Sequence, residues 1–564
     1  DWTASSDSMQ AALKNAQLEI VSSGVEMADA LAWYRAFHPG VAEQLALNGT
    51  ATMDVMLSGW PPRIQKGTVA SEGAELDGGS TPVPIRMGRA SLLFSRDSVS
   101  LAHAIFSIGV RAGEFRVRGS AGRLPQWHSA WKLDGQTTEV RTLFGAANSL
   151  GFSLPPGWLI DGPVQFHLQW QSSTSSSRSS APPFALPSSL STMFRHPQGA
   201  LTLAGVTVRA PFLNHEITHV SGAVNLLPAD DVKIQLTSAG AFAANWRGTL
   251  ERRMGESEWQ FALSASRLDA AEMDRWLNPR RRESFLDRVL PFLASKPQPH
   301  PIPAWLRGHG SVSFDEFALA PFSLGQFTAD ASVDGRKLAL TNAHAEFYGG
   351  DLLGSIALNL AAQPTYDVIA KFSNVNLGLL ASRTLSLSDL FAGTASGALQ
   401  ISAKGVGRAA LLGSLACRGD ARIRDAQYNG IDLDESVRAG ARRPGITNFP
   451  AASADFSCAD GQVRFAKLNL GNQNAAYNAS GYVDFKRQMN LEFSPLSGNG
   501  VAVASHVLTS VSPNAPAHPV THVRVNAPAN PPVAASANAS TKKDPVATFQ
   551  LSGPLKSPAI KRIP

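Results

Sequence analysis

The sequence predicts a mostly β protein built from repeated antiparallel hairpins. In the stretch 327–360, apolar residues occupy every second position, as in Phe327, Ala329 and Ala331, which places them on one face of a sheet. An Asp-Gly pair, Asp334-Gly335, separates two such runs and is a strong hairpin signal. The chain also holds 47 Gly and 36 Pro with only 17% charged residues, which favours turn-rich β structure over long helices.

The hairpin is repeated four times along the chain. The copies are 90–101, 222–236, the stretch 327–360 and 454–468. Matching their turns makes four residues equivalent: Val99, Val232, Leu338 and Val463. A glycine-led strand follows each hairpin, beginning at Gly119, Gly248, Gly354 and Gly481. A shared strand order at unequal intervals is typical of a repeating β module that has received insertions.

Short helices are predicted at several places, and one of them is the apolar segment 284–293. Glu26–Ala36 has helical spacing, and two further segments follow copies two and three at Ala270–Leu277 and Leu377–Leu385, with Asp269 as an N-cap. The expected organisation is a helical lead-in (1–47), module 1 (48–170), a flexible Ser/Pro-rich insertion (171–191), module 2 with a helical segment (192–300), module 3 (301–395), module 4 (396–506), a disordered Pro/Ala-rich linker (507–546) and a C-terminal strand (547–564).

Composition argues against several classes of function. A net charge of +6 over 564 residues, without a basic tract, does not indicate nucleic-acid binding. The two cysteines, Cys417 and Cys458, could form one disulfide in an oxidising compartment or remain separate buried thiols. No apolar run reaches 18 residues, so no transmembrane helix is expected in the sequence. The sequence also shows no signal peptide, and its first residue is Asp1 rather than Met, so we expect the chain to begin inside a longer protein.

Three segments resemble the C-terminal region of the AsmA family of bacterial envelope proteins. They are EFYGGDLLGSIALNL at 346–360, the two strands and small-residue turn of 397–433, and LSGPLKSPAIK at 551–561. The resemblance covers roughly 308–561 and is weaker over 48–277. It implies an elongated, repeating antiparallel β-sheet that is curved into a U-shaped apolar groove with short capping helices, as in bridge-like lipid transfer proteins.

The resemblance also implies a location and a function. Such proteins extend into the periplasm from an inner-membrane anchor, an N-terminal helix that this chain does not contain. They act in outer-membrane biogenesis and in phospholipid movement between the inner and outer membranes. Phospholipid, or another acyl lipid, and the two membranes or their proteins are therefore the expected partners, and nucleic acid is not.

One apolar face of this kind must be covered, either by a second layer of protein or by acyl chains. Each methylene moved from water onto the face gains about 0.8 kcal/mol. The residues expected to line the groove are Leu338, Leu340, Leu352, Ile356, Leu358, Leu360, Val368 and Phe372. The alternative is that these residues fill a closed core, since period-two alternation is the same in both cases.

The sequence contains no nucleophile elbow, zinc-protease motif or phosphate-binding loop. We therefore expect no enzyme, no metal and no cofactor. The rival functions are an envelope scaffold with a closed, dry core and, less favoured, a glycan-active enzyme, whose carboxylates would have to converge. Arg280, Arg281 and Arg282, ahead of the apolar segment 284–293, suggest a membrane-surface contact or a capping helix with solvated basic residues.

Overall fold

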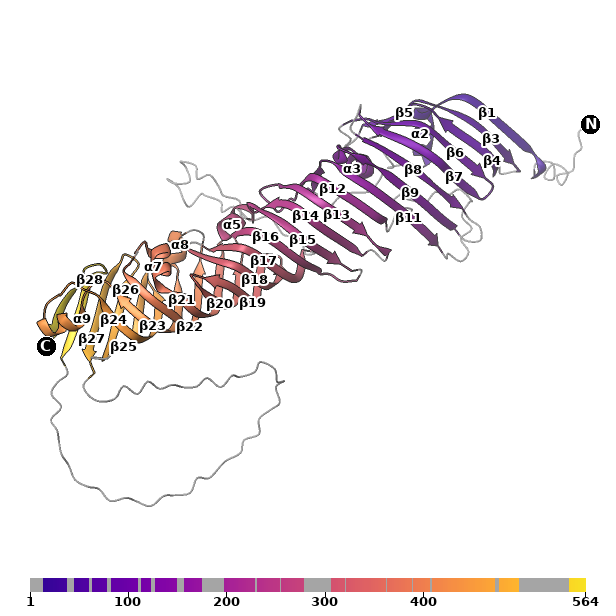
Figure 1. Cartoon of the computed structure of the whole chain (residues 1–564). Helices are drawn as coiled ribbons and strands as arrows, with labels where there is room; N and C mark the ends of the chain where they lie inside the picture. The colour runs from indigo at the N-terminus through magenta and orange to yellow at the C-terminus, as the bar shows by residue number, and fades with distance from the viewer. Residues whose placement is uncertain are drawn as a thin grey trace, which may run out of the picture. The chain divides into compact units, whose positions relative to one another are not determined.

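In the computed structural model, 71% of the described residues are in strands and 11% are helical, which confirms the predicted mostly β fold (Figure 1). The structure describes residues 14–37, 45–59, 63–78, 83–109, 113–122, 127–149, 157–174, 197–228, 231–253, 255–277, 306–319, 321–361, 363–387, 389–405, 408–471, 476–496 and 547–563. These residues belong to two compact units. Unit 1 comprises 1–386, 395–419 and 458–461, and unit 2 comprises 387–394, 420–457 and 462–564.

Unit 1 contains a long sheet in which strands that follow one another along the chain mostly lie side by side (Figure 1). Its strands are β1 (Gln17–Glu26), β2 (Leu45–Asn48), β3 (Thr50–Ser58), β4 (Arg63–Ser71), β5 (Ala74–Gly78), β6 (Ile85–Ser95), β7 (Ser98–Ile108), β8 (Gly113–Gly122), β9 (Trp127–Thr137), β10 (Leu159–Asp161), β11 (Val164–Thr174), β12 (Gln198–Arg209), β13 (Ile217–Leu226), β14 (Val232–Ala241), β15 (Ala244–Arg252), β16 (Trp259–Asp269), β17 (Arg307–Leu319), β18 (Phe322–Asp334), β19 (Lys337–Phe347), β20 (Gly350–Asn359) and β21 (Thr365–Asn376). Neighbours pair antiparallel except β16 and β17, which are parallel. Strands β22 (Phe391–Lys404), β23 (Ala416–Tyr428) and β24 (Thr447–Ala459) contribute residues to both units.

Four short helices follow strands at one edge of the unit 1 sheet, which we call the helix edge. They are α2 (Met27–Phe37), α3 (Val140–Ser149), α5 (Ala270–Leu277) and α7 (Leu377–Leu385), and Figure 1 shows α3, α5 and α7 along this edge. The predicted helices after copies two and three are confirmed. The Asp269 carboxylate accepts a hydrogen bond from the Ala271 N–H at 2.8 Å, as predicted for an N-cap, and the Asn376 side chain caps α7 in the same way.

The opposite edge, which we call the turn edge, carries the hairpin turns of β6–β7, β13–β14 and β18–β19. Helix α5 starts at the helix edge, yet the carbonyl of its last residue, Leu277, accepts a hydrogen bond from Arg336 in the β18–β19 turn. An eight-residue helix is about 12 Å long, whereas a straight strand of the length of β18 would span about 40 Å. The sheet must therefore curve until its two edges come within reach of α5.

A β-bulge recurs at the same place in each repeated hairpin. The pairing skips two residues after Leu101 in β7, after Leu340 in β19 and after Phe465 in β25 (Gln462–Gly471). These positions agree with the turn-based equivalence of copies one, three and four. In copy two the skip follows Leu236, so the equivalent of Val99 is Ile234 and not Val232. The prediction was wrong by two residues because the turn of copy two is longer than that of the other hairpins.

The glycines predicted to be equivalent share one physical role, although their register differs. Gly354 pairs with the residue after the bulge, whereas the other three pair with the residue before it. A Cβ added to Gly119, Gly248, Gly354 or Gly481 would lie 2.0–2.5 Å from a carbonyl oxygen of the next strand. Such a distance is far inside van der Waals contact, so the adjacent strand can approach only where a side chain is absent. The repeated glycine therefore allows close strand packing next to each bulge.

Gly248→Ala should destabilise unit 1 by about 3 kcal/mol, because Gly248 has φ +138° and its new Cβ would meet the Ala262 oxygen at 2.0 Å. Urea unfolding followed by tryptophan fluorescence measures the change in unit 1 alone, because all 11 tryptophans lie in that unit. Gly413→Ala is the matched control, since a Cβ there meets nothing within 4 Å. Equal midpoints for the two variants would contradict the close-packing role.

Unit 2 contains an antiparallel meander and one helix. Its further elements are β25, β26 (Ala476–Asp484), β27 (Gln488–Pro495), β28 (Thr548–Pro554), β29 (Ala559–Ile563) and α9 (Leu433–Ala439). The Tyr477 hydroxyl donates a hydrogen bond to Asp434 at 2.5 Å, and the Phe493 ring packs between the rings of Tyr477 and Phe549. Burial and the adjacent Asp434 raise the pKa of Tyr477 above its usual value. This aromatic cluster forms the interior of unit 2.

The described residues correct several predicted boundaries. The lead-in is not wholly helical, because β1 pairs with β3 and Leu45–Asn48 pairs with β5, and such distant partners leave no local signal. The predicted insertion begins too early, since 171–174 complete β11. The C-terminal segment is a hairpin, β28–β29, because Pro554 and Ser557 form a turn. The small-residue turn predicted within 397–433 contains the short helix α8 (Arg408–Gly413).

Other predictions fall outside the described residues. They are the linker 507–546, the remainder of the insertion up to residue 191, the apolar segment 284–293 and the three arginines Arg280, Arg281 and Arg282. The helix predicted at Glu26–Ala36 is confirmed as α2.

Candidate functional site

One row of side chains runs across unit 1 perpendicular to its strands, and every member is apolar or glycine. We call it the apolar row, and each member is the direct register partner of the next. From β6 to β21 it consists of Met87, Phe106, Phe115, Gly135, Phe166, Leu201, Val224, Ile234, Leu250, Phe261, Gly310, Ala331, Leu340, Ile356 and Val368. At about 4.8 Å per strand the row is about 70 Å long, more than twice the thickness of a bilayer's hydrocarbon core, about 30 Å.

The row changes in accessibility along its length. Its members in β12–β16, from Leu201 to Phe261, are all half-buried. In β18–β20 the members Ala331, Leu340 and Ile356 are 4%, 1% and 4% exposed. The row is thus more accessible over β12–β16 than over β18–β20, although Phe261 packs against the core cluster that holds Leu340 and Ile356, and Leu201 packs against a second core cluster.

The eight residues that sequence reasoning expected to line the groove lie at the closed end. Register places them together, with pairs such as Leu338–Leu358, Leu340–Ile356 and Leu352–Phe372. Five are almost fully buried, namely Leu340, Leu352, Ile356, Leu358 and Leu360, whereas Leu338, Val368 and Phe372 are half-buried. Here the alternation belongs to a filled core.

Helix α5 explains why this end is closed. Met273 and Leu277 of α5 belong to the same hydrophobic cluster as Phe327, Leu340 and Ile356. Burial, together with the nearby carboxylates of Asp274 and Asp269, raises the pKa of Tyr366 to about 12. Tyr366 lies in β21 and is 2% exposed. The helix is therefore part of the core at this end of the row, and its last carbonyl is joined to Arg336 at the turn edge.

The row members in β12–β16 were not predicted to line a groove. Their alternation is visible in the hairpin of copy two, where Val224, Val232 and Ile234 share a face. That pattern indicated a repeat, but nothing in it indicated that this copy is less covered than copy three. The accessible stretch depends on where α5 packs, and only the structure gives that.

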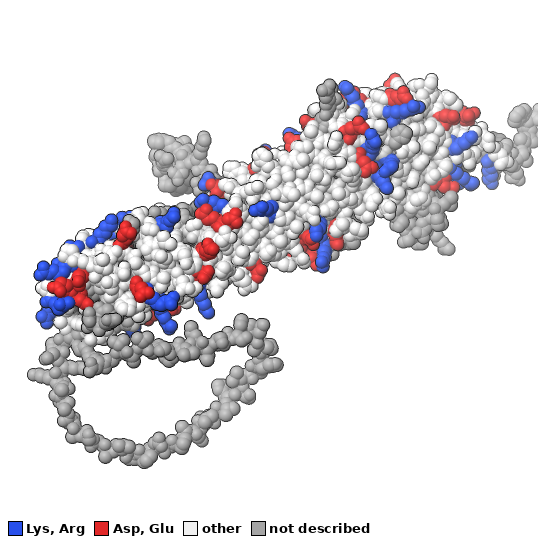
Figure 2. All heavy atoms as spheres, in the orientation of Figure 1, with Lys and Arg blue, Asp and Glu red and all other residues white. Residues whose placement is uncertain are grey.

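The other face of the sheet is polar and carries ion pairs between neighbouring strands. Lys233 and Glu251 pair at 2.5 Å, and Arg267 and Glu316 pair at 3.4 Å. Figure 2 shows that uncharged residues cover much of the visible surface and that charged side chains lie in small groups of both signs. These ion pairs are typical of a solvent-exposed sheet face. The continuous apolar row is therefore the feature of unit 1 that needs a functional explanation.

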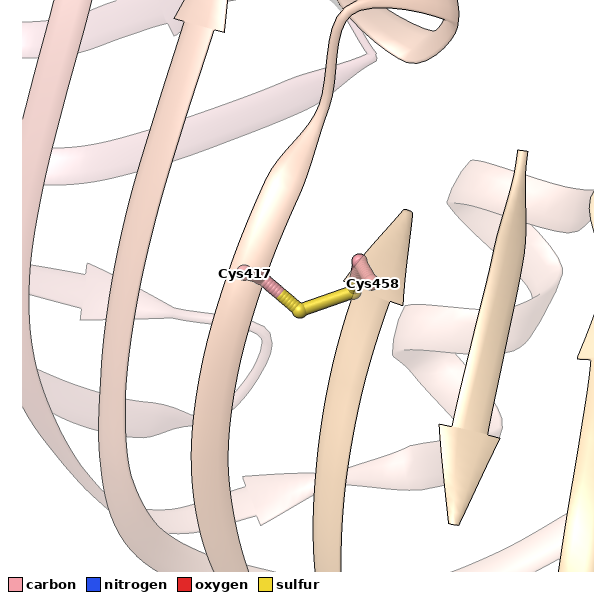
Figure 3. The surroundings of a disulfide bond; sticks show 2 residues. All are labelled: Cys417 and Cys458. Carbon is pink, nitrogen blue, oxygen red and sulfur yellow. A yellow bond between two sulfur atoms is a disulfide. The ribbon is translucent and has the colours of Figure 1, made fainter. Parts of the chain in front are cut away.

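Cys417 in β23 and Cys458 in β24 form a disulfide, with Cα atoms 4.5 Å apart (Figure 3). The two strands lie next to each other in Figure 3, and the bond joins residues separated by 41 positions. Of the two states that the sequence left open, the structure has the bridged one.

The structure holds few other candidates for chemistry. In the described ranges, no three metal-binding side chains come together. Within the same ranges, no helix combines the length and apolar character that a bilayer crossing needs. Three depressions of about 360–480 Å³ are lined largely by small or polar residues, such as Ser311, Ala130 and Thr218. The third depression is lined by Glu216, His219 and Ser238 among others.

Comparisons of this chain with protein-family models, with curated proteins and with solved structures found no match.

Proposed function

We propose that the protein shields the acyl chains of phospholipid, or of another acyl lipid, on its apolar row and transfers such lipid between membranes. The observation that supports this function is the unbroken register of fifteen apolar or glycine residues, half-buried over β12–β16. A monomeric enzyme or a dry scaffold has no need of a continuous, accessible apolar face of this length.

The energetics of the accessible stretch favour acyl chains as the occupant. Each methylene transferred from water gains about 0.8 kcal/mol, so ten methylenes laid along β12–β16 gain about 8 kcal/mol before ordering costs. The row offers no fixed polar partner at any of its positions, so a chain can move from strand to strand without breaking hydrogen bonds. A protein that moves lipid along its surface must bind the acyl chain strongly, and it must bind the chain about equally well at each strand.

The setting that we propose is the bacterial envelope, in a protein similar to the AsmA family that supports outer-membrane biogenesis. In this proposal the protein lies in the periplasm, tethered to the inner membrane, and its partners are the two membranes or their proteins. The Cys417–Cys458 disulfide supports an oxidising compartment.

A second candidate function is an envelope scaffold with a closed core that acts through protein partners. The near-complete burial of Ile356 and Leu358 by the hydrophobic cluster of module 3 favours it. The scaffold predicts that no part of the apolar row contacts lipid, so the two functions differ in a measurable way.

Lipid contact should occur at Phe261 and not at Gln260. The two residues are adjacent in β16, but Phe261 belongs to the apolar row and Gln260 is exposed on the polar face. With p-benzoylphenylalanine in place of either residue, illumination in the presence of phospholipid vesicles should crosslink lipid only at position 261. Mass spectrometry of the purified protein detects the adduct. No adduct at 261, or equal adducts at both positions, would favour the scaffold.

A further inference from the structure

A single charged residue interrupts the apolar face next to the open stretch. One step from the apolar row towards the turn edge lies a second row of residues, which we call the rim row. It consists of Leu133, Leu168, Gly199, Leu226, Val232, Arg252, Trp259, Gly308, Val333, Leu338, Leu358 and Tyr366. Arg252 is its only charged member.

Arg252 is placed by its strand and by one neighbour. It pairs in register with Val232 and lies two residues beyond Leu250, a member of the apolar row, so it shares the face of that row. Its guanidinium lies over the Trp259 ring, 5.1 Å from the ring centroid. Stacking on an aromatic ring holds the guanidinium plane while leaving its N–H donors directed outwards.

Two observations indicate that, within the described part of the chain, this site has donors without a partner. Neighbouring cations of the polar face are paired with carboxylates, as in Lys233–Glu251, but Arg252 makes no ion pair with any described residue. The Trp259 Nε1–H is buried and has no hydrogen-bond partner in the described part of the chain. An arginine that has no carboxylate partner among the described residues, beside an N–H donor that is likewise unpaired there, lies at the border of an apolar face and is suited to an anion with an attached apolar chain.

We infer that Arg252 and Trp259 form a headgroup site for acyl lipids that carry a phosphate. The acyl chain lies along the apolar row from Leu250 towards Leu201, and the phosphate oxygens accept hydrogen bonds from the Arg252 guanidinium at the turn edge. This inference rests on the proposed function, because it assigns the headgroup class to a face that is first proposed to hold the chain.

Two fluorescent amphiphiles with the same labelled acyl chain test the site, one ending in a phosphate monoester and the other in glycerol. The whole protein should bind the phosphate probe more tightly. Arg252→Gln should weaken that binding about tenfold, the loss expected for a charge-assisted hydrogen bond, and leave the glycerol probe unaffected. Arg252→Lys should restore part of the difference. Inorganic phosphate in excess should not displace the phosphate probe, because it lacks the apolar chain.

Arg247→Gln is the matched control, since Arg247 lies in the same strand with an exposed side chain and pairs in register with Ser264. It should change neither affinity. Equal affinity of the unaltered protein for both probes, or an equal loss for both in Arg252→Gln, overturns the headgroup site but leaves lipid binding standing. Binding of neither probe removes the proposed function as well. Displacement by inorganic phosphate alone would show a free-phosphate site in place of a lipid site.

Discussion

Ile234→Asp is expected to leave unit 1 folded while abolishing lipid crosslinking at Phe261, whereas Ile356→Asp is expected to unfold module 3. Both residues belong to the apolar row, but Ile234 is half-buried and Ile356 is 4% exposed. A carboxylate at position 356 would be buried without a partner and should cost about 5 kcal/mol. At position 234 the carboxylate keeps contact with water, so its main effect is on an apolar ligand.

Hydrogen exchange of the strand amides, read alongside the crosslinking, separates the two outcomes. Ile234→Asp should retain protection in β13–β15 and lose the lipid adduct. Gln235→Asp, the adjacent and exposed residue of the polar face, is its control and should lose neither. Loss of protection in Ile234→Asp would mean that this stretch is also a closed core. Retained protection in Ile356→Asp would mean that module 3 is more open than its burial indicates.

Ile234 and Ile356 also show which features of the groove could be predicted from the sequence. The face on which each side chain lies was predictable, but the extent to which that face is covered was not. Alternation correctly placed Leu340 and Ile356 on one face, because the period of a strand is two whatever covers it. It could not show that both residues lie in a core cluster to which α5 contributes Met273 and Leu277. That closure depends on contacts such as Leu277 with Arg336, 59 residues apart, and no local pattern encodes them. The accessible stretch was therefore expected in module 3, where the alternation is clearest, but it lies in module 2.

Features that depend on residues close in sequence were predicted correctly, whereas features that depend on residues far apart in sequence were not. Asp269 as an N-cap and the Gly335 turn were predictable, because each depends on residues a few positions away. The pairing of Leu45 with Gly78 joins strands whose partners cannot be read from either segment alone. The sequence did not single out Arg252, because a charged residue beside a turn is common on a protein surface. Its proposed role depends on its lying on the same face of the sheet as Leu250, which only the strand register shows.

Removing the disulfide should lower the stability of β23 and β24 by about 4 kcal/mol. A bridge between residues 41 positions apart restricts the unfolded chain, and the chain-entropy relation gives a value of this size for such a loop. The double variant Cys417→Ser/Cys458→Ser avoids leaving one free thiol. Because the chain has two units, one global unfolding midpoint is not a defined quantity, and the change is best measured as local opening free energy by hydrogen exchange.

The amides of β23 and β24 should exchange faster in the double variant, and those of β12–β14 should not change, which makes the latter an internal control. Reductant should accelerate exchange in the unaltered protein towards that of the variant and have no effect on the variant itself. Since Cys458 is only 9% exposed, the reductant should act slowly on the folded chain. Unchanged exchange in β23 and β24 would mean that the strands hold each other without the bridge. In that case the fold would not require the disulfide, and the disulfide would no longer be an argument for an oxidising compartment.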